Sequence, residues 1–403
     1  TLIETRSPVV GNLNGLPAGV RDEANRTQLD RDLALAEKDE LTAEEEAVLA
    51  NAEATQANLE EAEQFEDPLD GDPVVVQLYV YEPAAFEGDG RVAVAIGNVD
   101  TADHVAVNVP GFLAEVEGMD PQRAYNVYGE ARFASRDSVA VIDWMGYNAP
   151  SPGGDDGVAD ASNVLDMGAA EAGATLLADD VAGIVAMRPD DDPHLTVIGN
   201  SYGSTTVAIA ADERGLQADD VILTGSPGAG NADTAADFTT GTDHTWVASS
   251  STDAVTYFGH SDGSIRWFGA LGNDPAMDDF EAQRIQAENV DRENPVNPLN
   301  VPGQHGAYYD DDSESLFNVG LIVGGEYDRV LPADHRHQQP VLDLQNPVLP
   351  GDGPFWQFRL SWPLDVNAPW PTDPEAGREP ELHSSNPDAV LEEDGDDEDE
   401  EVA

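Results

Sequence analysis

A serine flanked by glycines is the feature of this sequence that most clearly could do chemistry. Residues 194–211 read HLTVIGNSYGSTTVAIAA, and positions 199–203 form a G-x-S-x-G pattern with Ser201 at its centre. An apolar stretch precedes the pattern and a run of small residues follows it, which predicts a strand, a sharp turn and a helix. Such a turn lifts the serine hydroxyl above a sheet, and the glycines let strand and helix approach closely. We therefore predict that Ser201 is a nucleophile rather than an idle serine in a Gly-rich turn.

A serine hydroxyl needs a general base, and in strand–turn–helix sites of this kind the acid and then the histidine follow the serine along the chain. His305 lies in VPGQHGAYY, a Gly-flanked loop just before a predicted helix, and we predict it as the base. His260, in YFGHSDGS, is the main rival. The remaining downstream histidines lie in a strand start, a polar stretch or the acidic tail: His244, His335, His337 and His383.

The acid that orients the base is expected on the turn after the second strand beyond the nucleophile helix. Asp253, in HTWVASSSTDAV, occupies that place. It would accept the imidazole N–H, fix the tautomer and stabilise the imidazolium. Because the chain is so acidic, a solvated loop carboxylate is the alternative interpretation, and Asp262 and Asp274 are the other candidates.

Backbone N–H groups are expected to stabilise the negative charge that develops on the attacked carbonyl oxygen. One would come from Tyr202, directly after the nucleophile. The second would come from Phe112, in the loop NVPGFLAEV after the third predicted strand, where Gly111 allows a close approach.

The elements that must position these residues alternate between short β-rich blocks and helical stretches from residue 74 onward. Predicted strands cover 74–81, 91–98, 104–109, 138–144, 194–200, 220–226 and 244–250. Predicted helices cover 121–133, 164–187, 201–215 and 313–325. The first strands follow one another without a helix, and the later ones are continuous apolar runs. This order predicts an α/β fold whose mostly parallel central sheet has an antiparallel start and helices on both faces.

The chain divides by composition into three parts. Residues 1–70 contain helical stripes over 20–66, with a capping box at Thr42, and predict a helical hairpin packed on the adjacent domain; a detached acidic helix is the alternative. Residues 71–330 form the α/β domain. Residues 331–403 are rich in Pro and acidic residues, carry tryptophans that could dock on the domain, and are predicted to be disordered at the end.

Charge and composition exclude several function classes. Eighteen Lys and Arg against 80 Asp and Glu give a formal net charge of −62, which disfavours nucleic acid and anionic membranes as partners and favours adaptation to high salt. The chain has no cysteine, so thiol catalysis and thiolate metal sites are excluded. Acidic stretches at 151–163, a lid-like loop, and at 310–312 match no calcium-loop spacing, and we expect no metal and no cofactor.

The sequence resembles actinobacterial α/β-hydrolases of unassigned function that often follow a WXG-type secretion module. The resemblance spans about residues 12–325 and rests on these segments: NGLPA from 14, VRD from 20, ANR from 24, TADHVAV from 101, VPG from 109, DWMGY from 143, GNSYG from 199, GSPG from 225 and the stretch from His305 to Leu316. It implies the α/β-hydrolase fold and supports Ser201 and His305 as nucleophile and base. Asn200 departs from the family, which usually has His before the serine.

We therefore predict a serine hydrolase of carboxylic esters or related small acyl compounds. A binding or interaction protein on a hydrolase scaffold is the alternative from another class, and acyl transfer to another alcohol is a third interpretation. Residues 1–8 lack a signal-peptide pattern, which slightly favours a soluble, cytoplasmic protein over an exported one, although the chain starts at Thr1 rather than Met.

Overall fold

The computed structural model describes residues 2–112, 115–150, 167–250, 253, 255–256, 271–288, 305–311, 313–333, 342–345, 357–360 and 383–386. Its central feature is an eight-stranded sheet with the order β1-β2-β4-β3-β5-β6-β7-β8. The strands are β1 (Val76–Glu82), β2 (Arg91–Ile96), β3 (His104–Val109), β4 (Val139–Met145), β5 (His194–Asn200), β6 (Asp220–Thr224), β7 (Thr245–Ala248) and β8 (Gln283–Ile285). Strand β2 pairs antiparallel with both β1 and β4, and every later pairing is parallel. The predicted fold class is confirmed.

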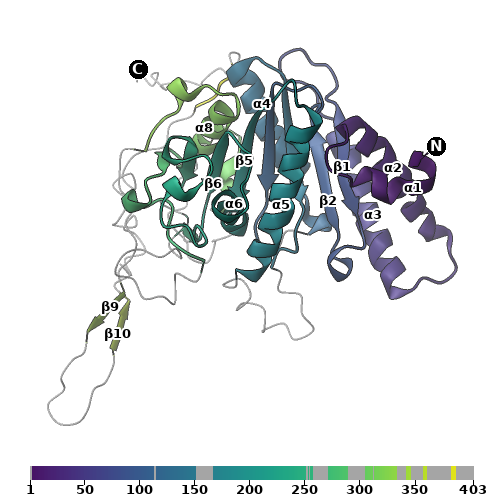
Figure 1. Ribbon diagram of the computed structural model, residues 1–403, viewed down its shortest axis with the longest axis horizontal. Helices are drawn as coiled ribbons and strands as arrows, with labels where there is room; N and C mark the ends of the chain where they lie inside the picture. The colour runs from purple at the N-terminus through teal and green to yellow at the C-terminus, as the bar shows by residue number, and fades with distance from the viewer. Residues whose placement is uncertain are drawn as a thin grey trace, which may run out of the picture.

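Seven α-helices accompany the sheet: α1 (Leu2–Gly11), α2 (Ala18–Leu33), α3 (Ala43–Ala62), α4 (Pro121–Ser135), α5 (Gly168–Met187), α6 (Tyr202–Glu213) and α8 (Glu314–Val323), as counted in the described part of the chain. Alternation along the strands sends one set of side chains to each face of the sheet. Side chains of α5 and α6 share one apolar core with one face. Those of α4 and α8 share a second core with the opposite face, so the sheet is covered on both sides (Figure 1).

Strand β8 and helix α1 are among the elements that the sequence patterns did not predict. Strand β8 has three residues and includes an exposed Gln283 and a half-buried Arg284, so it carries no apolar run. Helix α1 contains Pro8 and a non-helical residue at Arg6, and such positions disfavour a regular helix.

The N-terminal helices lie at the β1 edge of the sheet, in purple in Figure 1. The capping box predicted at Thr42 is present, because its hydroxyl accepts the Glu45 N–H while the Glu45 carboxylate accepts the Thr42 N–H. The hairpin packs on the α/β domain, since α2 and α3 share an apolar core with β1 and β2.

The same helices supply hydrogen bonds to the outer edge of β1. The Asn12 amide pairs with both the N–H and the C=O of Tyr81, at 2.9 Å each. The Leu78 N–H donates to the Asp22 carboxylate at 2.7 Å, and the Leu78 C=O accepts from the buried Asn25 amide at 2.9 Å. These side chains satisfy backbone groups that an open edge would offer to another chain.

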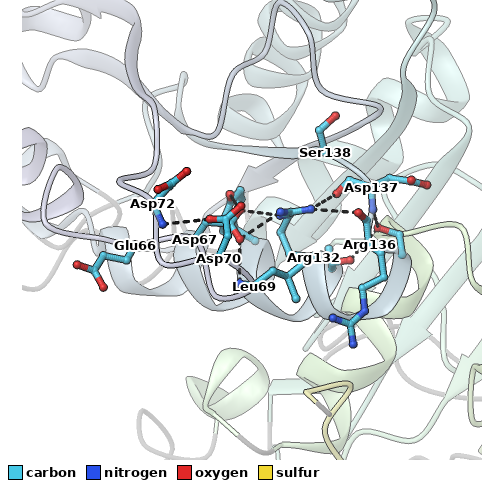
Figure 2. Close-up of polar contacts among 12 residues, drawn as sticks. Glu66, Asp67, Leu69, Asp70, Asp72, Arg132, Arg136, Asp137 and Ser138 are labelled. Atoms are coloured by element: carbon cyan, nitrogen blue, oxygen red, sulfur yellow. Dashed lines mark hydrogen bonds and ion pairs between the residues drawn. The ribbon is translucent and has the colours of Figure 1, made fainter. Parts of the chain in front are cut away.

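A bidentate ion pair connects the end of the helical hairpin to α4 (Figure 2). Arg132 donates to both carboxylate oxygens of Asp67, at 2.7 and 3.1 Å, and also to the C=O of Asp137 at 2.7 Å. Burial raises the pKa of Asp67, but the hydrogen bonds from Arg132, Tyr128 and the Leu69 N–H outweigh it, and the pKa lies below its ordinary value. The positive charge of Arg132 therefore stabilises the ionised Asp67 carboxylate in this acidic turn.

Two parts of the C-terminal extension belong to the described residues. Strands β9 (Leu342–Gln345) and β10 (Gln357–Leu360) pair antiparallel. Residues 383–386 lie against the domain, because the Ser385 N–H donates to Glu130 of α4 at 2.6 Å and the His383 ring lies 5.2 Å from that of Phe317. His383 is thus placed against α8 rather than in a disordered tail as predicted.

Candidate active site

The turn between β5 and α6 has the geometry that a nucleophile elbow requires. Ser201 stands between the last residue of β5 and the first residue of α6, with φ of 54° and ψ of −129°. A positive φ is costly for a residue with a side chain, and it persists where the surroundings enforce it. Two backbone hydrogen bonds contribute here: the Ser201 N–H donates to Thr224 of β6, and the Ser201 C=O accepts the Ser204 N–H, each at 2.9 Å.

The flanking glycines are required by close backbone contacts. A Cβ on Gly199 would lie 2.5 Å from the Cα of Ser204. A Cβ on Gly203 would lie 2.3 Å from the carbonyl oxygen of Val109 in β3. No side chain fits at these distances, so the glycine pattern of the sequence is explained by strand–helix approach.

His305 and Asp253 lie in contact, although 52 positions separate them in the chain. The His305 Nδ1 lies 2.7 Å from the Asp253 Oδ2. The Asp253 side chain is fully buried, whereas that of His305 is 17% exposed. The other ring nitrogen, Nε2, is buried and makes no hydrogen bond within the described residues. An Nδ1–H donated to Asp253 leaves Nε2 as the free base, which is the tautomer that general-base catalysis needs.

Gly225 contacts the His305–Asp253 pair and lies next to a residue that is hydrogen-bonded to Ser201. It follows β6, has φ of 56°, and a Cβ there would lie 3.0 Å from both the Asp253 Oδ2 and the His305 Cε1. Its neighbour Thr224 accepts the Ser201 N–H. The His305–Asp253 pair therefore lies against the residue that follows β6, and the last residue of β6, Thr224, is hydrogen-bonded to Ser201.

Tyr308 is a residue that sequence reasoning missed. It is buried in the short 3-10 helix η9 (Ala307–Tyr309), and its hydroxyl donates to the Asp253 Oδ2 at 2.8 Å. The same hydroxyl accepts the Ser250 N–H at 3.0 Å. The signal in the sequence was a tyrosine three positions after the predicted base, one helical turn further on.

The loop that carries Phe112, one of the two predicted oxyanion donors, lies next to Ser201. A Cβ on Gly111 would be 2.5 Å from the Ser201 Cβ and 3.0 Å from its Oγ, so the loop after β3 touches the nucleophile. Phe112 follows on that loop, half-buried against the core. Tyr202 is the first residue of α6, where backbone N–H groups have no acceptor within the helix.

Aromatic rings support the elbow from the side of β4 and α5. The rings of Tyr147 and Tyr202 stack at 6.5 Å, and the Tyr147 hydroxyl donates to the Pro110 C=O at 2.8 Å. The Tyr202 hydroxyl accepts the Ala170 N–H of α5 at 3.2 Å. Asp143, near the end of β4, is buried and accepts a hydrogen bond from the Asn108 amide at 3.1 Å, and burial raises its pKa to about 6.

Two of the alternative candidates, His244 and Asp274, make other contacts. His244 contacts Asp220 at 2.9 Å, at the amino end of β7, and Asp274 accepts the Ala276 N–H at 2.9 Å. His260, Asp262, His335, His337 and the loop 151–163 lie outside the described residues. The described part of the chain holds no group of three or more His, Asp or Glu suited to a metal, and no helix there is long and apolar enough to cross a membrane.

The strand order of the sheet is that of an α/β-hydrolase fold. Residues 86–263 match a family model described as "Alpha/beta hydrolase". The chain has the α/β-hydrolase fold, and this segment carries the signature of the α/β-hydrolase family.

Relatives of this chain occur in mycobacteria. It is 33% identical over 418 residues to an uncharacterized protein of Mycobacterium tuberculosis, across 94% of this chain and 60% of the relative. It is 34% identical over 146 residues to an uncharacterized protein of Mycobacterium bovis, across 34% of this chain and 52% of the relative. The chain thus spans about three fifths or less of these relatives' lengths.

Solved structures with a similar fold include hydrolases. A dienelactone hydrolase from Anabaena variabilis aligns with a TM-score of 0.34 and 14% identity, over 64% of this chain and 99% of that chain. An esterase from Pyrobaculum calidifontis aligns with a TM-score of 0.34 and 12% identity, over 70% of this chain and 93% of that chain.

Proposed function

We propose that this protein is a serine hydrolase of carboxylic esters or related small acyl compounds, with Ser201, His305 and Asp253 as its triad. One observation carries the proposal: the His305 Nδ1 lies 2.7 Å from a fully buried Asp253, and the buried Nε2 has no hydrogen-bond partner among the described residues. Ser201 stands on a strained turn, and its N–H donates to Thr224, the residue before Gly225. A structural histidine would be expected to use both ring nitrogens when buried.

The chemistry follows from these positions. The Ser201 Oγ attacks the substrate carbonyl carbon while its proton passes to His305 Nε2, and Asp253 stabilises the imidazolium. The carbonyl oxygen becomes an oxyanion held by the backbone N–H groups of Tyr202 and Phe112. The intermediate collapses, and the leaving alcohol takes the proton from His305. Water then repeats the sequence on the acyl-enzyme, giving the acid and free Ser201.

The strongly acidic composition supports the proposal that the protein works at high ionic strength. A net charge of −62 causes self-repulsion that salt screens, since the Debye length falls from about 10 Å at 0.1 M to about 3 Å at 1 M. It also repels nucleic acid and anionic membranes, which is consistent with a small acyl compound as the substrate. An association with WXG-type secretion modules is a further part of the proposal, and it rests on the sequence resemblance.

Hydrolysis of p-nitrophenyl acetate and butyrate in molar salt tests the proposal. We expect Ser201→Ala to lower kcat by about 10⁴-fold or more, because removing a triad member leaves only binding and oxyanion stabilisation. An organophosphonate should label wild-type protein at Ser201 and leave the variant unlabelled. Equal hydrolysis in both proteins, without labelling of Ser201, would instead favour a binding protein on a hydrolase scaffold. An added alcohol acceptor separates hydrolysis from acyl transfer by its products.

A further inference from the structure

Asp253 faces a physical difficulty, because it has no exposed surface and would have to carry a negative charge. A buried carboxylate is stable as an anion only when hydrogen-bond donors replace the lost water. Three donors from the described residues reach it: His305 Nδ1–H at 2.7 Å, the Val255 N–H at 2.9 Å and the Tyr308 hydroxyl at 2.8 Å. The two side-chain donors, His305 and Tyr308, both contact the Oδ2 atom of Asp253.

The direction of the tyrosine's bond is fixed by its partners. The Tyr308 oxygen accepts the Ser250 N–H at 3.0 Å, so its single hydrogen is free for Asp253, an acceptor. Burial first, and then the charge of Asp253, raise the pKa of Tyr308 well above its ordinary value. Asp253 and the buried Glu288 are the carboxylates whose charges act on Tyr308 in the described part of the chain. The hydroxyl therefore remains a donor over the whole working pH range.

We propose that Tyr308 is a positioning residue of the active site, which holds the Asp253 carboxylate so that its Oδ2 faces the His305 Nδ1. This inference rests on the proposed function. Tyr308 touches neither the substrate nor the reacting atoms; it acts through Asp253. Its place on η9, three positions after His305, puts two of the side chains that contact Asp253 on a single short segment.

Removing the hydroxyl has two expected consequences. The carboxylate loses one of its three donors and gains freedom to rotate, so the imidazole is oriented less well. The oxygen that faces His305 also carries more negative charge, which favours the imidazolium and moves the protonation of His305 to higher pH. A residue with a merely structural role would change stability without moving that titration.

The test compares Tyr308→Phe with Tyr309→Phe. Tyr309 is the adjacent residue, is equally buried, and its hydroxyl contacts Thr224 at 3.1 Å rather than Asp253. We expect Tyr308→Phe to lower kcat about tenfold, as for loss of one charge-assisted hydrogen bond, with KM within about twofold. The acid limb of the kcat/KM profile and the NMR titration midpoint of the His305 imidazole should both move to higher pH. Tyr309→Phe should leave both where the wild type has them.

The two readouts separate this inference from the proposed function. If Tyr308→Phe matches Tyr309→Phe in kcat and in the His305 midpoint, Tyr308 has no positioning role. If the wild type shows no Ser201-dependent turnover, the proposed function fails, and the NMR midpoint then decides on the Tyr308–Asp253–His305 coupling by itself. A midpoint that stays unmoved in Tyr308→Phe overturns the inference in either case.

Discussion

At the scale of single residues, the site depends on positions where a side chain is absent as much as on those where one is present. Gly225 has a left-handed backbone conformation, and the space next to its Cα is filled by the rings of His305 and Tyr308 and the Asp253 carboxylate. Gly215, after α6, has nearly the same conformation, with φ of 65°, but a Cβ there would meet no atom within 4 Å. Substitutions at Gly225 and Gly215 therefore separate the energetic cost of the backbone conformation from that of steric contact.

We predict that Gly225→Ala lowers kcat/KM by about 100-fold or more, because misplacement of catalytic groups by about 1 Å has effects of that size. The new methyl group would lie 2.8 Å from the Tyr308 ring and 3.0 Å from both Asp253 and His305. Gly215→Ala carries the same backbone strain, about 1 kcal/mol, and should lower stability with little change in kcat/KM. Steady-state kinetics and urea unfolding of both variants check this. Equal kinetics in the two variants would contradict it.

At the scale of elements, a polar network lies at the amino ends of the strands, whereas Ser201 lies at their carboxyl ends. Asp220 opens β6, is fully buried, and contacts His194 at 2.8 Å, the Tyr327 hydroxyl at 2.6 Å and the Trp246 indole N–H at 2.8 Å. The His194 Nδ1 lies 3.1 Å from the C=O of Val323, the last residue of α8. A helix C-terminus favours a positive charge, so this end of the sheet suits an imidazolium.

This network predicts a pH dependence of stability. Burial lowers the pKa of His194, but the hydrogen bond and charge of Asp220 outweigh it, and the pKa in the folded protein is raised. The folded state therefore binds the proton more tightly than the unfolded chain. The resulting stabilisation is complete below about pH 6.5, the ordinary value for histidine, and is lost as pH rises through the raised pKa.

We expect the free energy of unfolding of the wild type to fall from about pH 6 to about pH 9, a range in which the surface carboxylates stay ionised. His194→Gln keeps a donor for Asp220 but cannot carry the charge, so its pH slope should be flatter and its stability lower at pH 6. Urea unfolding at constant ionic strength measures both. A variant whose slope equals that of the wild type would show that His194 does not carry this dependence.

At the scale of the whole molecule, charge sets the conditions under which the fold is stable. Eighty acidic residues against 18 basic ones give strong self-repulsion in the compact state. Structured ion pairs such as Asp67–Arg132 use some of the few cations, and the remaining carboxylates depend on solvent and salt for screening.

We predict that the urea midpoint of unfolding rises steadily between about 0.1 M and about 2 M NaCl, as the Debye length shrinks from about 10 Å to below about 3 Å. Sucrose at matched osmolality should stabilise less, because it strengthens burial without screening charge. A salt series that follows the sucrose series would mean that self-repulsion is not what limits stability.

Local signals in the sequence were sufficient to predict the fold class and the nucleophile turn. Buried parallel strands are continuous apolar runs, and the glycines around Ser201 are dictated by local strand–helix contact, so both signals are short-range. The positions of Asp253 and His305 were predicted from the chain order typical of the fold. The capping box at Thr42 was predictable for the same local reason as the turn.

Which groups meet in space depends on the tertiary structure. The contact between His305 and Asp253 joins residues far apart in the chain, and Tyr308 and Gly225 gain their roles solely from what surrounds them. The three-residue strand β8 and the edge contacts of Asn12 with Tyr81 likewise have no periodic signal. Periodicity reports which face of an element is buried, whereas a catalytic geometry depends on distances between elements, and those are set by packing of the whole core.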